Sequence, residues 1–474
     1  MKRIAILMAA LALGTTLASA QIAATSAKSY AKPAHRTKRF LVTDFGAVGD
    51  GKTVNTKAIQ AAIDKCAANK KGGVVVVPQG TFLSGAIFLR QGVNLLVEKD
   101  GVLKGTTNPD DYPQIQTRWE GTEEMYTASF VNAEGVTGLT ISGEGTIDGS
   151  GEEWVQKNPY RRPPAAAPGA ASAAAAAPIV TPPPAPAAAP ATPPMAAAAR
   201  PAAPGPGTGP RRGRPRLIGI QNSKDVLISG LNLHNQAVWC LFVLYSQNVE
   251  IDGVKITAEH NIPSSDGIDI DSSKHVHITN VFIDDDDDCI SIKSGKDADG
   301  LRVNRPAEDI LIENSHFAYG QGGVAMGSET SGGIRNVTVL NCVMDSGNWA
   351  PIRFKSQPSR GGVVENITYS DIQLNGTRQA FEFNMEWRMV PPIAPPAKVL
   401  PIVRNVTIRN VRGTVRTVGV MHGLAGSPIR NVKFEKCDIT ADKGLVIENA
   451  RNVDLSGLKL TVKNGDAITK KNVE

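Results

Sequence analysis

A short segment repeats along most of the second half of this 474-residue chain. Each copy has a short strand of alternating β-branched and polar residues, then a polar or glycine bend, then a second short strand. Consecutive copies begin roughly 21 to 39 residues apart, and they read DVLISGLNLHN, NVEIDGVKITA, HVHITNVFIDD, DILIENSHFAYG, NVTVLNCVMDSG, NITYSDIQLNG, NVTIRNVRGTV, NVKFEKCDITA and NVDLSGLKLTV. Such a repeat marks a solenoid, and β-branched strands without intervening helices indicate a parallel β-helix.

The repeat therefore predicts an all-β fold, a right-handed parallel β-helix. Alternation along each strand sends Val and Ile inward and polar residues outward. We interpret the Asn that begins many copies as a turn residue. The Leu and Asn spacing of a leucine-rich repeat is missing, which disfavours that solenoid.

The N-terminal end of the solenoid needs a cap, because its last coil would otherwise expose unpaired backbone groups and apolar core residues to solvent. A helix expected at about 56–69 can provide it. The preceding GAVGDGKT at 46–53 fits the phosphate-binding P-loop pattern. Asp50 would place an anion inside that cradle, and no later strand supplies a convincing Mg²⁺ ligand. We therefore interpret this stretch as a glycine-rich turn into the cap and expect no cofactor.

The first 20 residues have the pattern of a secretory signal peptide, with Lys2 and Arg3, an apolar run and a final Ala-Ser-Ala. We therefore expect a secreted or periplasmic protein. The apolar run is too short to span a membrane comfortably, and no other stretch is long enough. Residues 21–39 are expected to form a linker before a β-helix domain over 40–474.

A Pro/Ala-rich insert interrupts that domain at 157–214. Its composition blocks regular structure and buries too little apolar surface to offset the ordering entropy, so we expect disorder. The formal net charge is +6, but the stretch 155–216 carries eight positive charges and no Asp or Glu, and two more lie in 1–20. The rest of the chain is thus mildly acidic, with a formal net charge of about −4. We expect no nucleic-acid partner.

Five cysteines lie far apart in the sequence. An odd, scattered set is not a disulfide framework, so we expect mainly buried thiols. They are Cys66, Cys240, Cys289, Cys342 and Cys437.

Acidic residues cluster at Asp266 and at Asp284–Asp288. Asp266 and Asp287 are roughly 21 residues apart, about one short coil, and neighbouring strands lie about 4.8 Å apart. Two or three carboxylates can therefore meet on one outer face. Repulsion between crowded carboxylates raises the pKa of one of them, so that a protonated carboxyl lies beside an ionised one. Glycoside hydrolysis requires such an acid and base. From the acids alone, a solvated acidic run or a Ca²⁺ site remains an equal alternative.

The stretch APIRFKSQ places Arg353 and Lys355 two residues apart, so that both face outward while Ile352 and Phe354 face the core. A guanidinium fork beside an ammonium group suits a carboxylated ligand. Plain surface charge is the simpler interpretation. The position of the two cations a few coils beyond the acids, on the same solenoid, favours the ligand site.

From about residue 40 to the C-terminus, apart from the insert, the sequence resembles the pectin-degrading polygalacturonase family, family 28 of glycoside hydrolases. The likeness rests on DFGAVGDGKTVNTKAIQAAID, GGVVVVPQGTFLSGAI and GEGTIDGSGEEW. The family's Asn-Thr-Asp motif appears as SSD, ending at Asp266, and its Gly-Asp-Asp-Cys as DDDC, with Asp287 and Asp288. Its Arg-x-Lys motif is Arg353-Phe354-Lys355.

The resemblance implies hydrolysis of pectin with inversion. Asp287 would protonate the glycosidic oxygen, Asp266 and Asp288 would activate water, and Arg353 and Lys355 would hold a galacturonate carboxylate. The implied partner is a pectic polysaccharide or oligosaccharide, with no metal. The sequence does not reveal the oligomeric state, and we favour a monomer. Inverting enzymes usually separate their carboxyl groups by about 6.5–9.5 Å, whereas adjacent coils suggest less.

Three motifs depart from the family pattern. Ser264-Ser265 replace Asn-Thr, Asp286 replaces Gly, and Gln321 stands where Gly-His-Gly has its His. Gln can hydrogen-bond but cannot carry a proton's charge, and His316 is nearby only in sequence. A rhamnogalacturonan backbone thereby becomes a more plausible substrate than plain polygalacturonan. Two further functions stay open: a Ca²⁺-dependent pectate lyase on the same fold, and a weakly active polysaccharide-binding β-helix.

Overall fold

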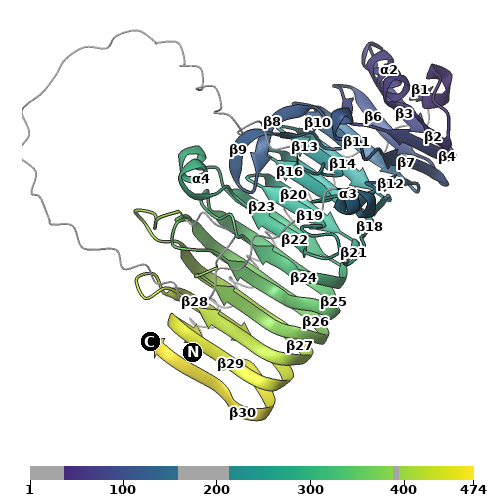
Figure 1. Ribbon diagram of the computed structural model, residues 1–474. Coiled ribbons are helices and arrows are strands. Elements are labelled where there is room, and N and C mark those ends of the chain that lie inside the picture. The colour runs from purple at the N-terminus through teal and green to yellow at the C-terminus, as the bar shows by residue number, and fades with distance from the viewer. Residues whose placement is uncertain (1–36, 158–212, 388–393) are drawn as a thin grey trace, which may run out of the picture.

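The computed structural model describes residues 37–157, 213–387 and 394–474. The chain winds into a long parallel solenoid, with the N-terminal cap at one end and β30 at the other (Figure 1). The predicted signal peptide, most of the linker and nearly all of the predicted disordered insert lie outside the described residues. Among the described residues, no helix is long and apolar enough to cross a membrane.

Strands of successive coils stack in register and form three parallel ladders. The first ladder contains β1 (Arg39–Leu41), β3 (Gly73–Val77), β6 (Val93–Val97), β11 (Thr137–Gly143), β14 (Lys224–Ser229), β17 (Gln247–Asp252), β20 (Lys274–Thr279), β23 (Ala307–Glu313) and β28 (Ile429–Glu435). The second contains β2 (Asp50–Val54), β4 (Gly80–Ser84), β7 (Gly101–Gly105), β12 (Thr146–Asp148), β15 (Asn232–His234), β18 (Lys255–Thr257) and β21 (Phe282–Asp284).

The third ladder positions the candidate site. It contains β5 (Ile87–Leu89), β10 (Val131–Glu134), β13 (Ile218–Gln221), β16 (Leu241–Leu244), β19 (Ile268–Asp271) and β22 (Asp288–Lys293). Towards the C-terminus long strands run around the coil and join several ladders: β24 (His316–Met326), β25 (Ile334–Lys355), β26 (Val363–Asn384), β27 (Ile402–His422), β29 (Cys437–Asp454) and β30 (Leu458–Val473). The parallel β-helix predicted from the repeat is confirmed.

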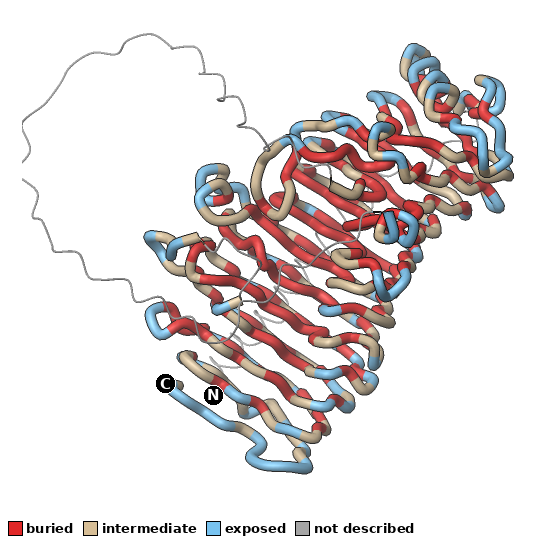
Figure 2. Tube along the Cα trace, in the orientation of Figure 1, coloured by how far each residue is buried: buried red, intermediate tan, exposed pale blue. Residues whose placement is uncertain are grey.

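Alternation along the strands builds the core. One inward row of the third ladder is fully buried and runs through Ile87, Val131, Ile218, Leu241, Ile268, Ile290, Val324, Ile352 and Phe381. Figure 2 shows buried residues along the coils and exposed ones at the turns and on β30. All five cysteines are free and buried, as predicted.

Asparagines at the starts of the repeats form a ladder of their own. Asn336, Asn366, Asn405, Asn431 and Asn452 all have a positive φ, between 52° and 58°, a conformation that Asn tolerates well. The amides of the last four each donate to the side-chain oxygen of the Asn one coil before, at 2.8–3.2 Å. The residues are left-handed bends inside strands β25 to β29, not turns between strands as predicted, and the stacked amides add an interaction between coils.

The helix α2 (Thr56–Ala67) caps the solenoid, and its buried face carries Ile59, Ile63 and Cys66. Shorter elements are η1 (Val42–Phe45), η2 (Pro109–Asp111), α3 (Gly151–Lys157) and α4 (Asp297–Val303). In the P-loop-like stretch, Asp50 Oδ1 accepts from the backbone N–H groups of Lys52 and Thr53 at 2.9 and 2.8 Å. The aspartate itself thus occupies two amides of the apparent phosphate cradle, so these amides are not free to bind a phosphate.

One antiparallel hairpin stands apart from the coils. It consists of β8 (Gln114–Trp119) and β9 (Thr122–Thr127). Arg118 joins it to the solenoid through a buried ion pair with Asp271 on β19, at 2.7 Å. The hairpin therefore lies beside the third ladder, on the N-terminal side of the acidic cluster (Figure 1).

Candidate active site

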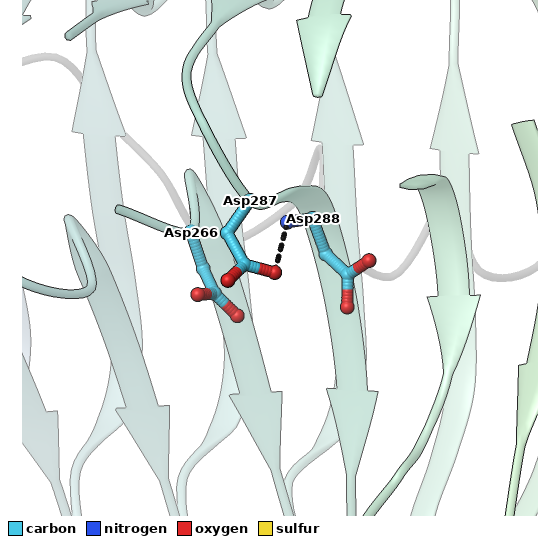
Figure 3. A group of neighbouring side chains, drawn as sticks. All are labelled: Asp266, Asp287 and Asp288. Carbon is cyan, nitrogen blue, oxygen red and sulfur yellow. Dashed lines mark hydrogen bonds between the residues drawn. The ribbon is translucent and has the colours of Figure 1, made fainter. Parts of the chain in front are cut away.

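The three aspartates singled out in the sequence meet at the start of β19 and β22. Asp266 lies just before β19, and Asp287 and Asp288 lie at the start of β22. Backbone bonds fix this stacking, since Gly267 N–H donates to the Asp288 carbonyl at 3.1 Å. One carboxylate oxygen from each of the three lies within 4.8 Å of the others (Figure 3). The predicted meeting of carboxylates one coil apart is confirmed.

Arg353 and Lys355, on the last part of β25, lie beside Asp288. Arg353 Nη1 contacts Asp288 Oδ1 at 3.1 Å, and Lys355 Nζ forms a close ion pair with Asp288 Oδ2. The Arg353 Nε also donates to Glu382 on β26 at 2.7 Å. The two cations point away from the core, as expected, but both are buried and already paired with carboxylates of the protein.

The pKa values of the neighbours Asp287 and Asp288 are pushed apart. Burial, reinforced by the charge of Asp288, raises the pKa of Asp287 above its ordinary value. Burial also opposes the ionisation of Asp288, but Lys355 and Arg353 outweigh it and lower the pKa of that carboxyl. Two carboxyl groups with opposite shifts are suited to act as an acid and a base.

Asp266 has the environment of a carboxyl that keeps its proton. Burial, followed by the negative charges of Asp269 and Asp287, raises its pKa well above the ordinary value. Figure 3 shows its side chain next to that of Asp287, while Asp288 lies on the other side of Asp287. Of the three aspartates, Asp288 is thus the one whose environment favours the charged form.

Sequence reasoning missed a buried lysine beneath the acids. Lys293 Nζ lies 3.5 Å from Asp266, 3.2 Å from Asp269 and 3.6 Å from Glu329, and 4.4 Å from the centre of the Trp239 ring. The strand ISIK carries it one coil after IDID, with Lys293 opposite Asp271. The sequence did contain a signal for this contact. Aligning ISIK with IDID puts Lys293 on the same outward face as Asp269 and Asp271 of the preceding coil.

Gln321 lies on β24, directly beside Asp287. Its backbone N–H donates to the Asp287 carbonyl at 2.7 Å, and its side chain is exposed. His316 does not take the place of the missing family histidine, because it lies opposite Phe282 on another ladder and its Nε2 contacts Asp345 at 2.6 Å. The residue that pairs with the Asp287 backbone on the following coil therefore has a neutral side chain.

Ser265 and Asp286, two of the residues that depart from the family pattern, contact each other. The Asp286 N–H donates to Ser265 Oγ at 3.0 Å. Ser265 is buried, whereas Asp286 is partly exposed, and burial, followed by the charge of Asp287, raises the pKa of Asp286 to about 6. The serine thus fixes the backbone immediately before the acidic pair.

Three clustered carboxylates are also a set that Ca²⁺ accepts. Here both oxygens of Asp288 already face cationic side chains, Arg353 and Lys355, and Asp266 faces Lys293. A cation bound by all three aspartates would have to compete with these internal cations. The donor set fits proton transfer better than metal binding.

A parallel β-helix that carries clustered acids with opposite pKa shifts beside buried cations defines a glycosidase-like class of protein. The family model "Glycosyl hydrolases family 28" matches residues 204–458, and "Rhamnogalacturonase A/epimerase, pectate lyase-like" matches residues 40–145. The chain therefore belongs to glycosyl hydrolases family 28 and is a glycoside hydrolase.

Named relatives agree with this assignment. The chain is 26% identical to "Probable polygalacturonase" of Vitis vinifera over 82% of this chain and 72% of that one. It is 25% identical to "Endo-polygalacturonase" of Pectobacterium carotovorum subsp. carotovorum, over 83% and 86%. The solved exopolygalacturonase of Thermotoga maritima shares the fold, with a TM-score of 0.67, 24% identity, and 95% and 96% of the two chains covered.

Proposed function

We propose that the protein hydrolyses α-glycosidic bonds in galacturonate-containing pectin, with inversion at the anomeric carbon. The observation that carries this proposal is the opposite pKa shift of Asp287 and Asp288 within one cluster of carboxyl groups. The names of its polygalacturonase relatives support a galacturonan substrate. The match of residues 40–145 to a rhamnogalacturonase-type family model keeps a rhamnogalacturonan backbone as a second substrate.

Each site residue has an assigned step. Asp287 keeps its proton and donates it to the oxygen of the scissile bond, so that the leaving sugar departs as a neutral alcohol. Asp288, held ionised by two cations, accepts a proton from the attacking water, and Asp266 orients that water by hydrogen bonding. Arg353 and Lys355 hold Asp288 ionised and offer their remaining N–H groups to a substrate carboxylate.

Gln321 is assigned to substrate binding. The residue is exposed, its backbone N–H donates to the Asp287 carbonyl, and a glutamine amide can donate to and accept from sugar hydroxyl groups. We further propose that the protein acts outside the cytoplasm, secreted or periplasmic, because of the signal-peptide pattern of residues 1–20.

The experiment is a panel of oligogalacturonates and rhamnogalacturonan oligosaccharides, with new reducing ends measured with and without EDTA. Hydrolysis predicts saturated products and activity that survives EDTA. A Ca²⁺-dependent pectate lyase, the alternative suggested by the three carboxylates, predicts an unsaturated uronate and activity restored by Ca²⁺. Absence of turnover on every substrate would favour a polysaccharide-binding protein instead.

A further inference from the structure

Arg216 is a buried cation that no carboxylate of the described residues contacts in an ion pair. Its residue surface is 2% exposed. The guanidinium is surrounded by four aromatic rings, at 4.0–5.4 Å from the ring centres of Phe242, Trp239, Trp119 and Tyr126. Its Nη2 donates to the Arg118 carbonyl, and its Nε has no hydrogen-bond acceptor among the described residues. The rings stabilise the charge in part, but a buried cation remains costly unless it is paired, and within the described part of the chain this one lacks an anion in contact with it.

A cavity of about 290 Å³ adjoins this arginine. It lies on the outward face of the third ladder, where Phe88, Gly219 and Phe242 occupy one row across neighbouring strands. The hairpin strand β8 covers it, and the Gln221 amide reaches that strand by donating to the Gln116 carbonyl at 3.0 Å. Arg90 and Glu134 are exposed at its rim, so the cavity opens to solvent.

The lining combines sugar-binding features with the Arg216 cation. Thr117, Ser129 and Gln221 provide hydroxyl and amide groups, while Phe88 and Phe242 provide apolar ring surfaces. Gly219 packs closely against Ser129, because a Cβ there would lie 2.4 Å from Ser129 Oγ, so this part of the lining accepts no larger residue. Burial lowers the pKa of Arg216 to about 10, so the guanidinium is still charged near neutral pH.

The cavity lies on the same ladder as the acidic cluster. Strands β13, β16, β19 and β22 are consecutive neighbours, and their register puts Gly219 three strands, or about 14 Å at about 4.8 Å per strand, from Ser291 on β22. Trp239 lies between the two places, with Arg216 on one side and Lys293 within 4.4 Å of its ring centre. A ligand in the cavity is thus a neighbour of the reacting groups but separate from them.

We propose that this cavity binds a hexuronic acid residue, with its carboxylate on Arg216 and its ring between Phe88 and Phe242. The choice of a uronate rests on the proposed function, because that substrate class supplies sugars that carry a carboxylate. The same chemistry is offered by the distal residue of a bound pectic chain and by a free monosaccharide, and the experiment distinguishes these two sources.

The direct test is isothermal titration of D-galacturonate and of uncharged D-galactose. It uses a Lys355→Met background, which weakens the carboxylate site beside the acids. We expect galacturonate to bind at least tenfold more tightly than galactose, and Arg216→Met to abolish the difference. Equal binding of the two sugars, or unchanged galacturonate binding in Arg216→Met, would overturn the proposal. This titration needs no turnover, so its result is independent of the proposed hydrolysis.

Because Arg216→Met removes a buried side chain and can impair folding, Gln221→Trp provides a second variant. Gln221 is partly exposed at the rim, and a Trp there fills the cavity from outside. Gln373→Trp, on an exposed turn of β26, is the matched control. We expect galacturonate binding to be lost in Gln221→Trp and kept in Gln373→Trp. Binding retained in a folded Gln221→Trp would contradict the assigned location.

The dependence of kcat/KM on the length of the oligogalacturonate substrate distinguishes the two sources of the uronate. If the cavity receives the distal residue of a bound chain, kcat/KM rises with oligogalacturonate length in the wild type, and Gln221→Trp removes the rise. If it receives the free monosaccharide, Gln221→Trp leaves the length dependence unchanged and removes only the binding of D-galacturonate. Both results support the cavity as a uronate site. A variant with neither effect would exclude it.

Discussion

Asp287 and Asp288 are consecutive residues, yet the protein shifts their pKa values in opposite directions. The difference arises from their partners: both oxygens of Asp288 contact cations of β25, whereas Asp287 Oδ1 accepts only a backbone N–H, that of Asp288, at 2.9 Å. The β-helix makes this possible because strands from distant repeats lie side by side. Asp288 is thereby paired with residues 65 and 67 positions further along the chain.

Replacing the assigned acid is the first test. We expect Asp287→Asn to fold normally and to lose about 10²–10⁴-fold in kcat, the usual contribution of a general acid. Asp284→Asn is the matched control, since Asp284 belongs to the same acidic run but faces His260 at 2.6 Å. Retention of more than half of the wild-type kcat in Asp287→Asn would remove Asp287 from its role.

Removing a cation from Asp288 should move the acid limb of the rate profile. In Lys355→Met the ionised form of Asp288 loses its closest partner, so its pKa rises. The base is then ionised only at higher pH, and the acid limb of kcat shifts to higher pH. Lys459→Met, which removes an exposed pair with Asp438, should leave the profile unchanged. Superimposable acid limbs in wild type and Lys355→Met would disprove this role.

The neutral amide at Gln321 should keep Asp287 protonated to higher pH than a histidine would. A positive imidazole beside Asp287 favours the carboxylate and lowers its pKa. We therefore expect Gln321→His to move the alkaline limb of kcat/KM to lower pH, with Gln373→His as a control. Activity on plain polygalacturonan is expected to increase. Coincident alkaline limbs and an unchanged substrate preference would show that Gln321 has no electrostatic role.

The buried Lys293 should be a large contributor to stability. Lys293→Met leaves Asp266, Asp269 and Glu329 without their shared cation. Removing one partner of a buried ion pair typically lowers the free energy of unfolding by about 3–5 kcal/mol. The exposed pair of Lys463 with Asp442 should contribute less than about 1 kcal/mol. Urea unfolding of Lys293→Met and Lys463→Met measures both. Equal effects of the two substitutions would contradict the network described here.

Sequence patterns were sufficient where the repeat determines the neighbours. The distance of about one coil between Asp266 and Asp287 predicted their contact, because the coil itself enforces it. Arg353 and Lys355 were placed on the right face by simple alternation. Their ion pairs with Asp288 could not be predicted, since coils vary in length and the register between β22, β24 and β25 sets the contact.

The hairpin β8–β9 and the surroundings of Arg216 were not predictable from local pattern. The hairpin is antiparallel inside a parallel fold, and its anchor joins Arg118 to Asp271, 153 residues away. Arg216 belongs to the basic stretch at the end of the Pro/Ala-rich segment, where composition alone suggests solvent exposure. Only the fold brings Trp239 and Phe242 against it.

The stereochemistry of the product tests the central claim most directly. One carboxylate oxygen from each of the three aspartates lies within 4.8 Å of the others, closer than the roughly 6.5–9.5 Å usual for inverting enzymes and near the roughly 5–5.5 Å of retaining ones. Proton NMR of freshly cleaved oligogalacturonate resolves the first anomer formed. Acid–base catalysis by Asp287 and Asp288 through a water molecule predicts that the β anomer is formed first from the α-linked substrate. First appearance of the α anomer would contradict the account, because it would make one of these aspartates a nucleophile.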